Sequence, residues 1–220
     1  MPHRILAAII CAALTSGSAA DAGAILSPVA VISNTGGSSG SGFEITNTID
    51  QSGLSTGFVS GVTDFDTYLA TNPLHSFQTG EWFSQIGPLR AVIVYDLGQS
   101  FLVTRMALWN EEAAGILSTT VDISDDVTFV SFSNAGTFAP LSNQVNVDYP
   151  AEVFNLAPSV GRFVRMDVSG FAGGSFVSMG EIAFEVSSLP PTPDVVPEPA
   201  TFAIFGLMGL AAIGAARRRR

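Results

Sequence analysis

The chain has 220 residues, of which 47% are apolar and 13% charged, and its formal net charge is −10. It contains no lysine, and five of its nine arginines lie near the two ends. Residues 23–188 therefore hold four arginines against 16 acidic residues, a net charge of −12. So acidic a segment excludes nucleic-acid binding through phosphates, which needs a basic surface. The high apolar content excludes an intrinsically disordered chain.

Residues 1–22 have the pattern of a secretory signal peptide. A short basic start precedes the apolar run Ile5–Leu14, and small residues follow, which predicts cleavage after Ala20 or Ala22. The apolar run is too short to span a bilayer, which argues against a retained anchor helix. Cys11 is the only cysteine and lies within this run, so we expect a mature chain without a disulfide.

The segment 23–186 is predicted to form one domain of many short strands. Its apolar runs are rich in Val, Ile and Phe, turn residues separate them, and none keeps a helical period. This pattern favours an all-β sandwich or barrel. The expected strands are Ala24–Ile32, Ala91–Leu97, Leu102–Trp109, Thr119–Ser124, Thr128–Ser133, Glu152–Leu156, Phe163–Val168 and Ser178–Val186.

An ordered series of short segments in this domain resembles the discoidin, or coagulation factor 5/8 type C, family. The segments are Thr48–Asp50, Thr79–Ser84, Val94–Gln99, Val103–Met106, Val121–Asp126, Gly161–Met166 and Gly180–Val186. The resemblance implies a jelly-roll (galactose-binding-like) β-sandwich of a kind that often binds carbohydrates or lipid head groups. Two features depart from the family pattern: an insertion of about 20 residues between Asp50 and Trp82, and the lack of a terminal cysteine pair.

The same resemblance implies a structural calcium ion. In discoidin-like carbohydrate-binding modules the ion lies near the loop after the first strand and is closed by a glutamate of the last strand. Carried over by motif, this selects Asp50 and Glu181, with carbonyls of Gln51–Ser55 and the hydroxyl of Ser55 or Thr79. Hard cations take such oxygen ligands. The alternative is an ordinary Asp turn and an ordinary strand glutamate.

Catalytic motifs are scarce. His75 is the only histidine of the expected mature chain, and we interpret it as an exposed loop residue. No Gly-x-Ser-x-Gly turn accompanies it, and the chain lacks the ligands for a zinc site. The Gly/Ser run Gly36–Gly42 does not end as a phosphate-binding loop does, which argues against nucleotide binding.

Two pairs of neighbouring acids, Glu111-Glu112 and Asp125-Asp126, raise the possibility of glycoside hydrolysis. That reaction needs two carboxyl groups that face each other about 5–10 Å apart. Neighbours in an extended chain point to opposite faces, so neither pair fits that arrangement. Asp125-Asp126 is more typical of a turn between strands.

Aromatic residues could offer a platform for a sugar ring. Trp82 matches a core position of the family, whereas Trp109 ends a strand beside Asn110, where a ring and polar groups could meet a ligand. Tyr68 and His75 lie in the insertion Thr56–Gln78, which we expect to be exposed and to carry ligand specificity. Trp109 is also compatible with a place in the core.

The C-terminal segment has three parts in a fixed order after a proline-rich spacer at 187–196. Pro197, Glu198 and Pro199 precede an uncharged run at 200–216 and then four arginines. The run predicts a single transmembrane helix near the minimum length, with the arginines on the cytoplasmic side. The alternative is a permanent tail anchor.

This tail resembles the PEP-CTERM sorting signal of Gram-negative bacteria over residues 197–220. In that family an exosortase processes the tail, and the proteins are linked to exopolysaccharide and biofilms. The resemblance implies that Pro197, Glu198 and Pro199 are recognised, and that the helix anchors the protein transiently before it reaches the cell surface.

Together these features predict an exported, non-enzymatic module that binds carbohydrate in the extracellular polysaccharide matrix. Its expected partners are the general secretion machinery, an exosortase and the polysaccharide itself. The alternative is a structural or adhesive matrix protein without a small ligand, and a glycoside hydrolase is disfavoured.

Overall fold

The computed structural model describes residues 23–77, 79–87, 89–111, 115–143, 146–170 and 174–189. The predicted signal peptide, Glu112, the motif Pro197–Pro199 and the predicted helix at 200–216 lie outside these residues. Among the described residues, no helix has the length and apolar character needed to cross a membrane.

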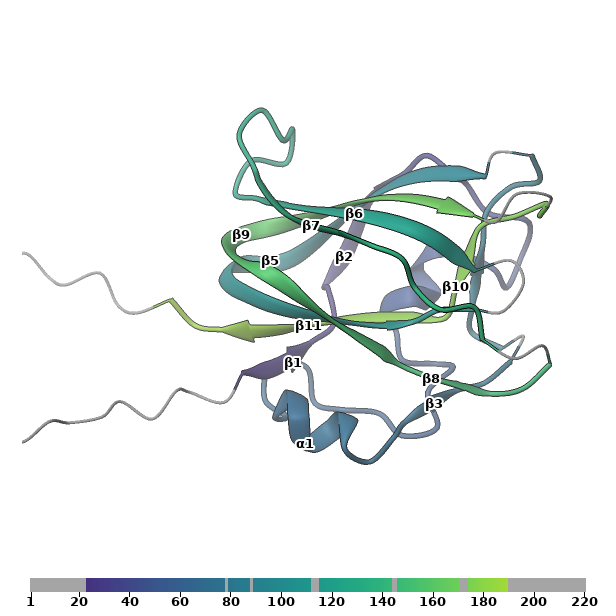
Figure 1. Ribbon diagram of the computed structural model, residues 1–220, viewed down its shortest axis with the longest axis horizontal. Helices are drawn as coiled ribbons and strands as arrows, with labels where there is room; N and C mark the ends of the chain where they lie inside the picture. The colour runs from purple at the N-terminus through teal and green to yellow at the C-terminus, as the bar shows by residue number, and fades with distance from the viewer. Residues whose placement is uncertain are drawn as a thin grey trace, which may run out of the picture. The chain divides into compact units, whose positions relative to one another are not determined.

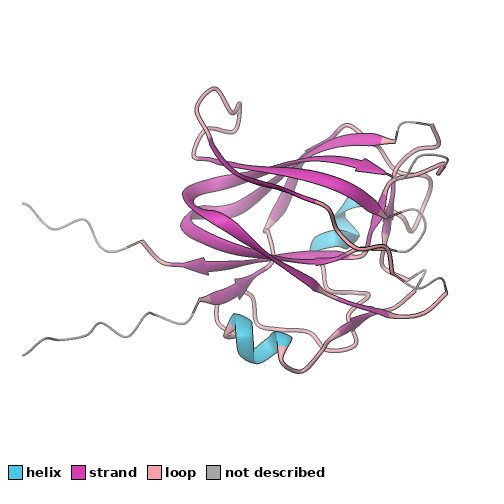
Figure 2. Ribbon diagram, in the orientation of Figure 1, coloured by secondary structure: helices cyan, strands magenta, loops and turns pink. Residues whose placement is uncertain are grey.

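The described residues form an all-β structure with two short helices (Figures 1 and 2). In chain order the elements are β1 (Ala24–Leu26), β2 (Ala30–Asn34), the 3-10 helix η1 (Ile45–Ile49), α1 (Phe65–Leu69), β3 (Leu74–His75), β4 (Trp82–Phe83), β5 (Arg90–Trp109), β6 (Ile116–Ser124), β7 (Ser133–Phe138), β8 (Tyr149–Pro150), β9 (Glu152–Gly170), β10 (Ser178–Met179) and β11 (Glu181–Ser187).

Two long, bent strands build the sandwich. The first part of β5 pairs with β2 and with the second part of β9, and its second part pairs with β11 and with the first part of β9. The seven-stranded sheet, in the order β1-β11-β5-β9-β6-β7 with β2 beside β5, therefore folds over itself into two layers (Figure 1). Gly98 lies at the bend of β5 with φ 89°, a conformation that favours glycine.

The strand prediction separated what the structure joins. Ala91–Leu97 and Leu102–Trp109 are both parts of β5, and Glu152–Leu156 and Phe163–Val168 are both parts of β9. The predicted strand Thr128–Ser133 is wrong, because residues 125–132 form a loop and β7 begins only at Ser133.

The main core lies between the layers. Met106 and Leu108 of β5 meet Ile182 and Phe184 of β11 in a cluster that also holds Trp82, as predicted for that tryptophan. Intervening residues point to the opposite face of the sheet, because side chains alternate along a strand. On β5 and β11 this outer face carries Ala107, Trp109 and Ala183 as well as charged side chains, and these apolar groups must be covered.

The described part of the insertion Thr56–Gln78 covers this outer face with the buried rings of Phe65 and Tyr68, while many of its other residues are exposed, as predicted. Its role in ligand specificity stays a prediction. A second buried cluster joins the insertion to β1, β5, β8 and β11 through Ile25, Phe65, Tyr68, Ala107, Trp109, Tyr149 and Ala183. The Arg105 guanidinium on the outer face of β5 bonds Asp66 of α1 and Glu185 of β11, each at 2.7 Å. The insertion is thus part of the folded domain.

Candidate functional site

Glu181 forms the centre of a buried acidic site at the start of β11. Its side chain is on the outer face of the strand and is fully buried. One carboxylate oxygen, Oε2, accepts a hydrogen bond from the backbone N–H of Gln51 at 2.9 Å, and Oε1 has no hydrogen-bond partner among the described residues. Burial raises the pKa of the Glu181 carboxyl well above its usual range, and the charge of Asp50 raises it further.

The loop after η1 approaches this glutamate. Asp50 ends η1 and accepts a hydrogen bond from the N–H of Ser52 at 2.8 Å, and Gln51 has a left-handed backbone with φ 62°. Asp50 is exposed and lies within electrostatic range of Glu181. Ser55 is exposed, and its Oγ accepts a hydrogen bond from the N–H of Leu74 at 2.9 Å. The structure therefore brings Asp50 and Glu181 together, while Ser55 ties the loop to β3.

This arrangement fits a hard cation better than a soft one. The Oε1 atom of Glu181 is a buried oxygen without a partner among the described residues. Burying a negative charge there costs free energy unless a cation or a hydrogen-bond donor contacts it. No group of three or more His, Cys, Asp or Glu side chains that could hold a metal occurs in the described part of the chain. A calcium ion would therefore also need backbone carbonyls and hydroxyls of the 51–55 loop, which calcium accepts readily.

The predicted exposure of Tyr68 and His75 is wrong, because both side chains are buried. Tyr68 is 4% exposed, packs against Phe58 with ring centroids 4.9 Å apart, and donates its hydroxyl proton to the carbonyl of Thr56. His75 is 0% exposed and stacks on Tyr149. Neither ring can contact a ligand at the surface.

Trp109 and Asn110 are also structural. The Trp109 indole is fully buried and donates to the carbonyl of Pro73 at 2.9 Å, which supports the core alternative. The Asn110 side chain donates to the carbonyl of Ile116 and accepts from its N–H, so it closes the turn between β5 and β6. Geometry does not support a ligand-binding role for either residue.

The buried imidazole of His75 predicts acid sensitivity. Burial lowers its pKa to about 4, below the ordinary value of 6.5. As the pH falls from 6.5 to 4, the unfolded chain gains a proton that the folded chain does not, so the free energy of unfolding should fall by about 3 kcal/mol. Denaturant titrations at several pH values measure this loss. The variant His75→Phe should lack it, and an equal slope in both proteins would contradict the assignment.

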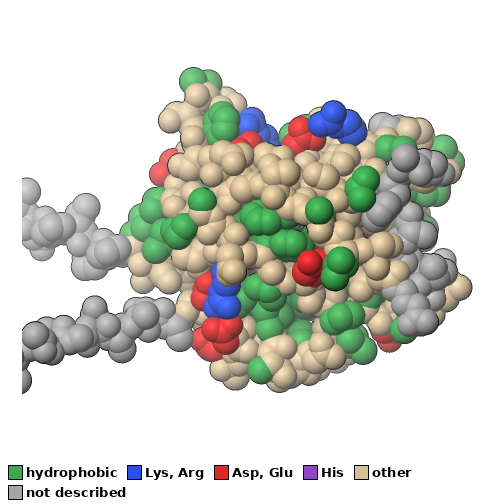
Figure 3. Space-filling view, viewed as in Figure 1, with side chains coloured by type: hydrophobic (Ala, Val, Ile, Leu, Met, Phe, Trp, Pro, Cys, Tyr) green, Lys and Arg blue, Asp and Glu red, His purple; other side chains and the backbone are tan. Residues whose placement is uncertain are grey.

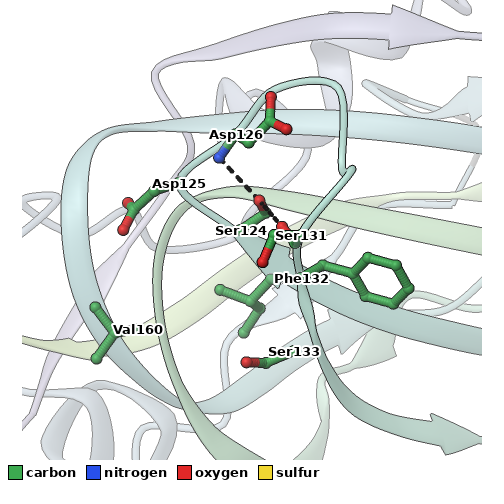
Figure 4. Close-up of a pocket in the computed structure, with 8 residues that line it drawn as sticks. Ser124, Asp125, Asp126, Ser131, Phe132, Ser133 and Val160 are labelled. Carbon is green, nitrogen blue, oxygen red and sulfur yellow. Dashed lines mark hydrogen bonds between the residues drawn. The ribbon is translucent and has the colours of Figure 1, made fainter.

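An open pocket lies where β6 ends, and sequence reasoning missed it. Its volume is about 390 Å³, within the range of small-molecule sites. It is lined by Ile123, Ser124, Asp125, Asp126, Ser131, Phe132, Ser133 and Val160. Asp125 and Val160 lie on one side and Ser131 and Ser133 on the other, while the Phe132 ring points away from Asp125 (Figure 4).

Asp126 holds the pocket loop in shape. Its carboxylate accepts hydrogen bonds from the N–H and hydroxyl of Thr128 and from the N–H of Val130, and these bonds lower its pKa, those from Thr128 most. The hydroxyl of Ser124 donates to the carbonyl of Ser131 at 2.6 Å (Figure 4). The predicted turn at Asp125-Asp126 is confirmed, because residues 125–132 form a loop between β6 and β7 and the N–H of Phe129 donates to the carbonyl of Asp126. A second pocket of about 450 Å³ is lined by residues of β1, β5 and β11, and none of its described lining residues is ionisable.

Comparisons with known proteins support two of the sequence predictions, the C-terminal sorting motif and the all-β sandwich fold. Residues 195–220 match the PEP-CTERM protein-sorting motif, which indicates an exported protein that an exosortase processes. No curated protein sequence matches the chain.

Several solved structures share the fold. One is the C-terminal domain of a chitobiase from Bacteroides fragilis, with 15% identity, a TM-score of 0.53, and coverage of 76% of this chain and 99% of that one. A putative chitobiase fragment from Bacteroides thetaiotaomicron has 15% identity, a TM-score of 0.52, and coverage of 74% and 91%. A mutant of chitosan-binding module 1 from a chitosanase/glucanase of Paenibacillus sp. IK-5 has 19% identity, a TM-score of 0.51, and coverage of 74% and 98%. At these identities the likeness establishes the all-β sandwich fold.

Proposed function

We propose that this protein is an exported, non-enzymatic carbohydrate-binding module of the extracellular polysaccharide matrix. The pocket at the end of β6 carries the proposal, because it combines an open cavity with polar side chains on a fixed loop. A chitosan-binding module has the same fold, which supports a saccharide as the ligand class. The sorting motif supports delivery through an exosortase, with residues 200–216 as a transient anchor.

The pocket offers the groups that saccharide recognition needs. The Asp125 carboxylate accepts hydrogen bonds from sugar hydroxyls, and the hydroxyls of Ser131 and Ser133 can donate or accept. Val160 is 44% exposed and presents an aliphatic surface to the C–H groups of a ring. A few polar groups that orient a ligand against an apolar wall are typical of such sites.

Binding fits this pocket better than hydrolysis. Hydrolysis needs one carboxyl group as acid and a second as base or nucleophile. Both carboxylate oxygens of Asp126 accept hydrogen bonds within the loop, from Thr128 and Val130. Asp125 alone is left to meet a ligand, which favours recognition without bond cleavage.

We further propose that Asp50 and Glu181 hold a structural calcium ion, with carbonyls of Gln51–Ser55 and the Ser55 hydroxyl as additional ligands. On β5, Trp109 pairs with Glu181 and Leu102 with Val160. Leu102 and Trp109 are seven residues apart on β5, which corresponds to roughly 23 Å of extended chain. The proposed calcium site at Glu181 and the pocket at Val160 are therefore separated by about this length. Calcium would therefore stabilise the domain without touching the saccharide, and chelation should leave the saccharide affinity of the folded protein unchanged.

Filling the pocket tests the proposed function. The variant Val160→Trp should lower saccharide affinity at least about 10-fold, because an indole occupies the cavity, while a strand position accepts tryptophan. Glycan arrays followed by calorimetry, on the full chain in a detergent without a sugar head group, measure this. Val153→Trp is the control, because Val153 is equally exposed on β9 but outside the pocket. No binding to any glycan, or equal binding by both variants, would overturn the proposal.

A further inference from the structure

The arginines of the described domain are all engaged in ion pairs. Figure 3 shows blue arginine groups beside red carboxylates on the visible face. The pairs are Arg90 with Asp167 at 3.5 Å, Arg105 with Asp66 and Glu185 at 2.7 Å, Arg162 with Asp96 at 2.7 Å, and Arg165 with Asp122 at 2.8 Å. With no lysine in the sequence, the described surface offers an anionic ligand no unpaired cationic side chain.

The acids of the pocket are in the opposite situation. Neither Asp125 nor Asp126 takes part in an ion pair of the described residues, and no basic side chain lines the pocket. Asp125 is exposed and accepts a hydrogen bond from the hydroxyl of Ser100, which leaves its charge uncompensated. The pocket is therefore a concave, negatively charged site in a domain of net charge −12.

The geometry also leaves one charge free to meet a ligand. The Asp126 carboxylate is held by Thr128 and Val130 of its own loop, whereas Asp125 lies across the pocket from Ser131 and Ser133 (Figure 4). A ring placed between them would contact Val160 and present one substituent to the Asp125 carboxylate. A charge-assisted hydrogen bond at that position is stronger than one between neutral groups.

We propose that this pocket selects a sugar unit that carries a free ammonium group, as in a deacetylated amino-sugar polymer, and that Asp125 receives the ammonium. This inference rests on the proposed carbohydrate-binding function and names its ligand class. The negative charge of Asp125 also discriminates against sugars with carboxylate or sulfate groups, because such groups would face this carboxylate without an unpaired cation nearby.

Calorimetry with three trisaccharides tests the inference: a glucosamine trimer, its fully N-acetylated form and a glucose trimer, each titrated into the full chain at pH 6 in a detergent without a sugar head group. We expect the glucosamine trimer to bind at least about 10-fold more tightly than the other two, a difference of about 1.4 kcal/mol. Its affinity should weaken as salt is raised, since salt screens exposed charges.

The variant Asp125→Asn isolates the charge. Asparagine keeps an acceptor for Ser100, so the fold is retained, but the preference for the glucosamine trimer should shrink to less than about 3-fold. Glu44→Gln, which removes one exposed charge far along the chain from the pocket residues, should keep the full preference. A preference that survives in Asp125→Asn, or wild-type protein that binds all three trimers equally, would overturn the ligand class alone. Absence of binding to every trimer and every array glycan would overturn the proposed function with it.

Discussion

Calcium should raise the melting temperature of the wild-type protein by about 5–10 °C at a concentration 100-fold above its dissociation constant. A ligand that binds only the folded state at this excess adds about 2.7 kcal/mol of stability, and about 2–4 °C per kcal/mol is expected for a domain of this size. Glu181→Gln should abolish this response, because the neutral amide cannot supply the buried negative oxygen that the ion would meet.

The stability of the wild-type and Glu181→Gln proteins without calcium gives a second test of the buried charge. The pKa of Glu181 is raised in the folded state, so its charge destabilises the fold, and the free energy of unfolding should rise as the pH falls through this raised pKa. Without calcium, Glu181→Gln should therefore be at least as stable as wild type at pH 7.5. The control Glu152→Gln keeps its bond from Leu141 and should respond to calcium as wild type does. Unchanged melting on chelation would argue against the ion.

Replacement of Arg105 by alanine should destabilise the domain by about 2–3 kcal/mol. Breaking a fully buried ion pair costs about 3–5 kcal/mol, and the partial exposure of Arg105 reduces this. The variant leaves Glu185 without its cation and removes the guanidinium from above the Phe65 ring, 4.5 Å away. These contacts hold α1 and the insertion against the outer face of the sandwich.

Arg90→Ala is the matched control for this prediction. Arg90 is 75% exposed and 3.5 Å from Asp167, so its loss should cost less than about 0.5 kcal/mol. Chemical denaturation of both variants measures the difference. Equal stability of the two variants would contradict the packing of the insertion as described.

The sequence predicted the fold class because alternation and turn residues are local signals. It divided β5 and β9 into separate strands because the bends near Gly98 and Gly161 have the composition of ordinary turns. It misjudged Thr128–Ser133, where Asp126 bonds Thr128 and Val130 and replaces strand pairing with a loop. A run of β-branched and aromatic residues cannot reveal such a side-chain bond.

The candidate sites were predictable only in part. Asp50 and Glu181 are 131 residues apart in sequence, and only the family resemblance brought them together. Tyr68 and His75 were misjudged because the polar composition of the insertion hides the apolar outer face that it covers. The pocket was missed because Val160, which completes its wall, follows Asp125 by 35 residues, and no local pattern links the two.

The most direct test of carbohydrate binding is to locate the ligand by nuclear magnetic resonance. Amide chemical shifts of the isotope-labelled protein would be followed as the glucosamine trimer is added. The proposed binding site predicts that the largest changes cluster at residues 123–126, 131–133 and 160, which line the pocket. Changes confined to the surface around Asp50 and the 36–44 loop, or no changes at saturating ligand, would contradict it.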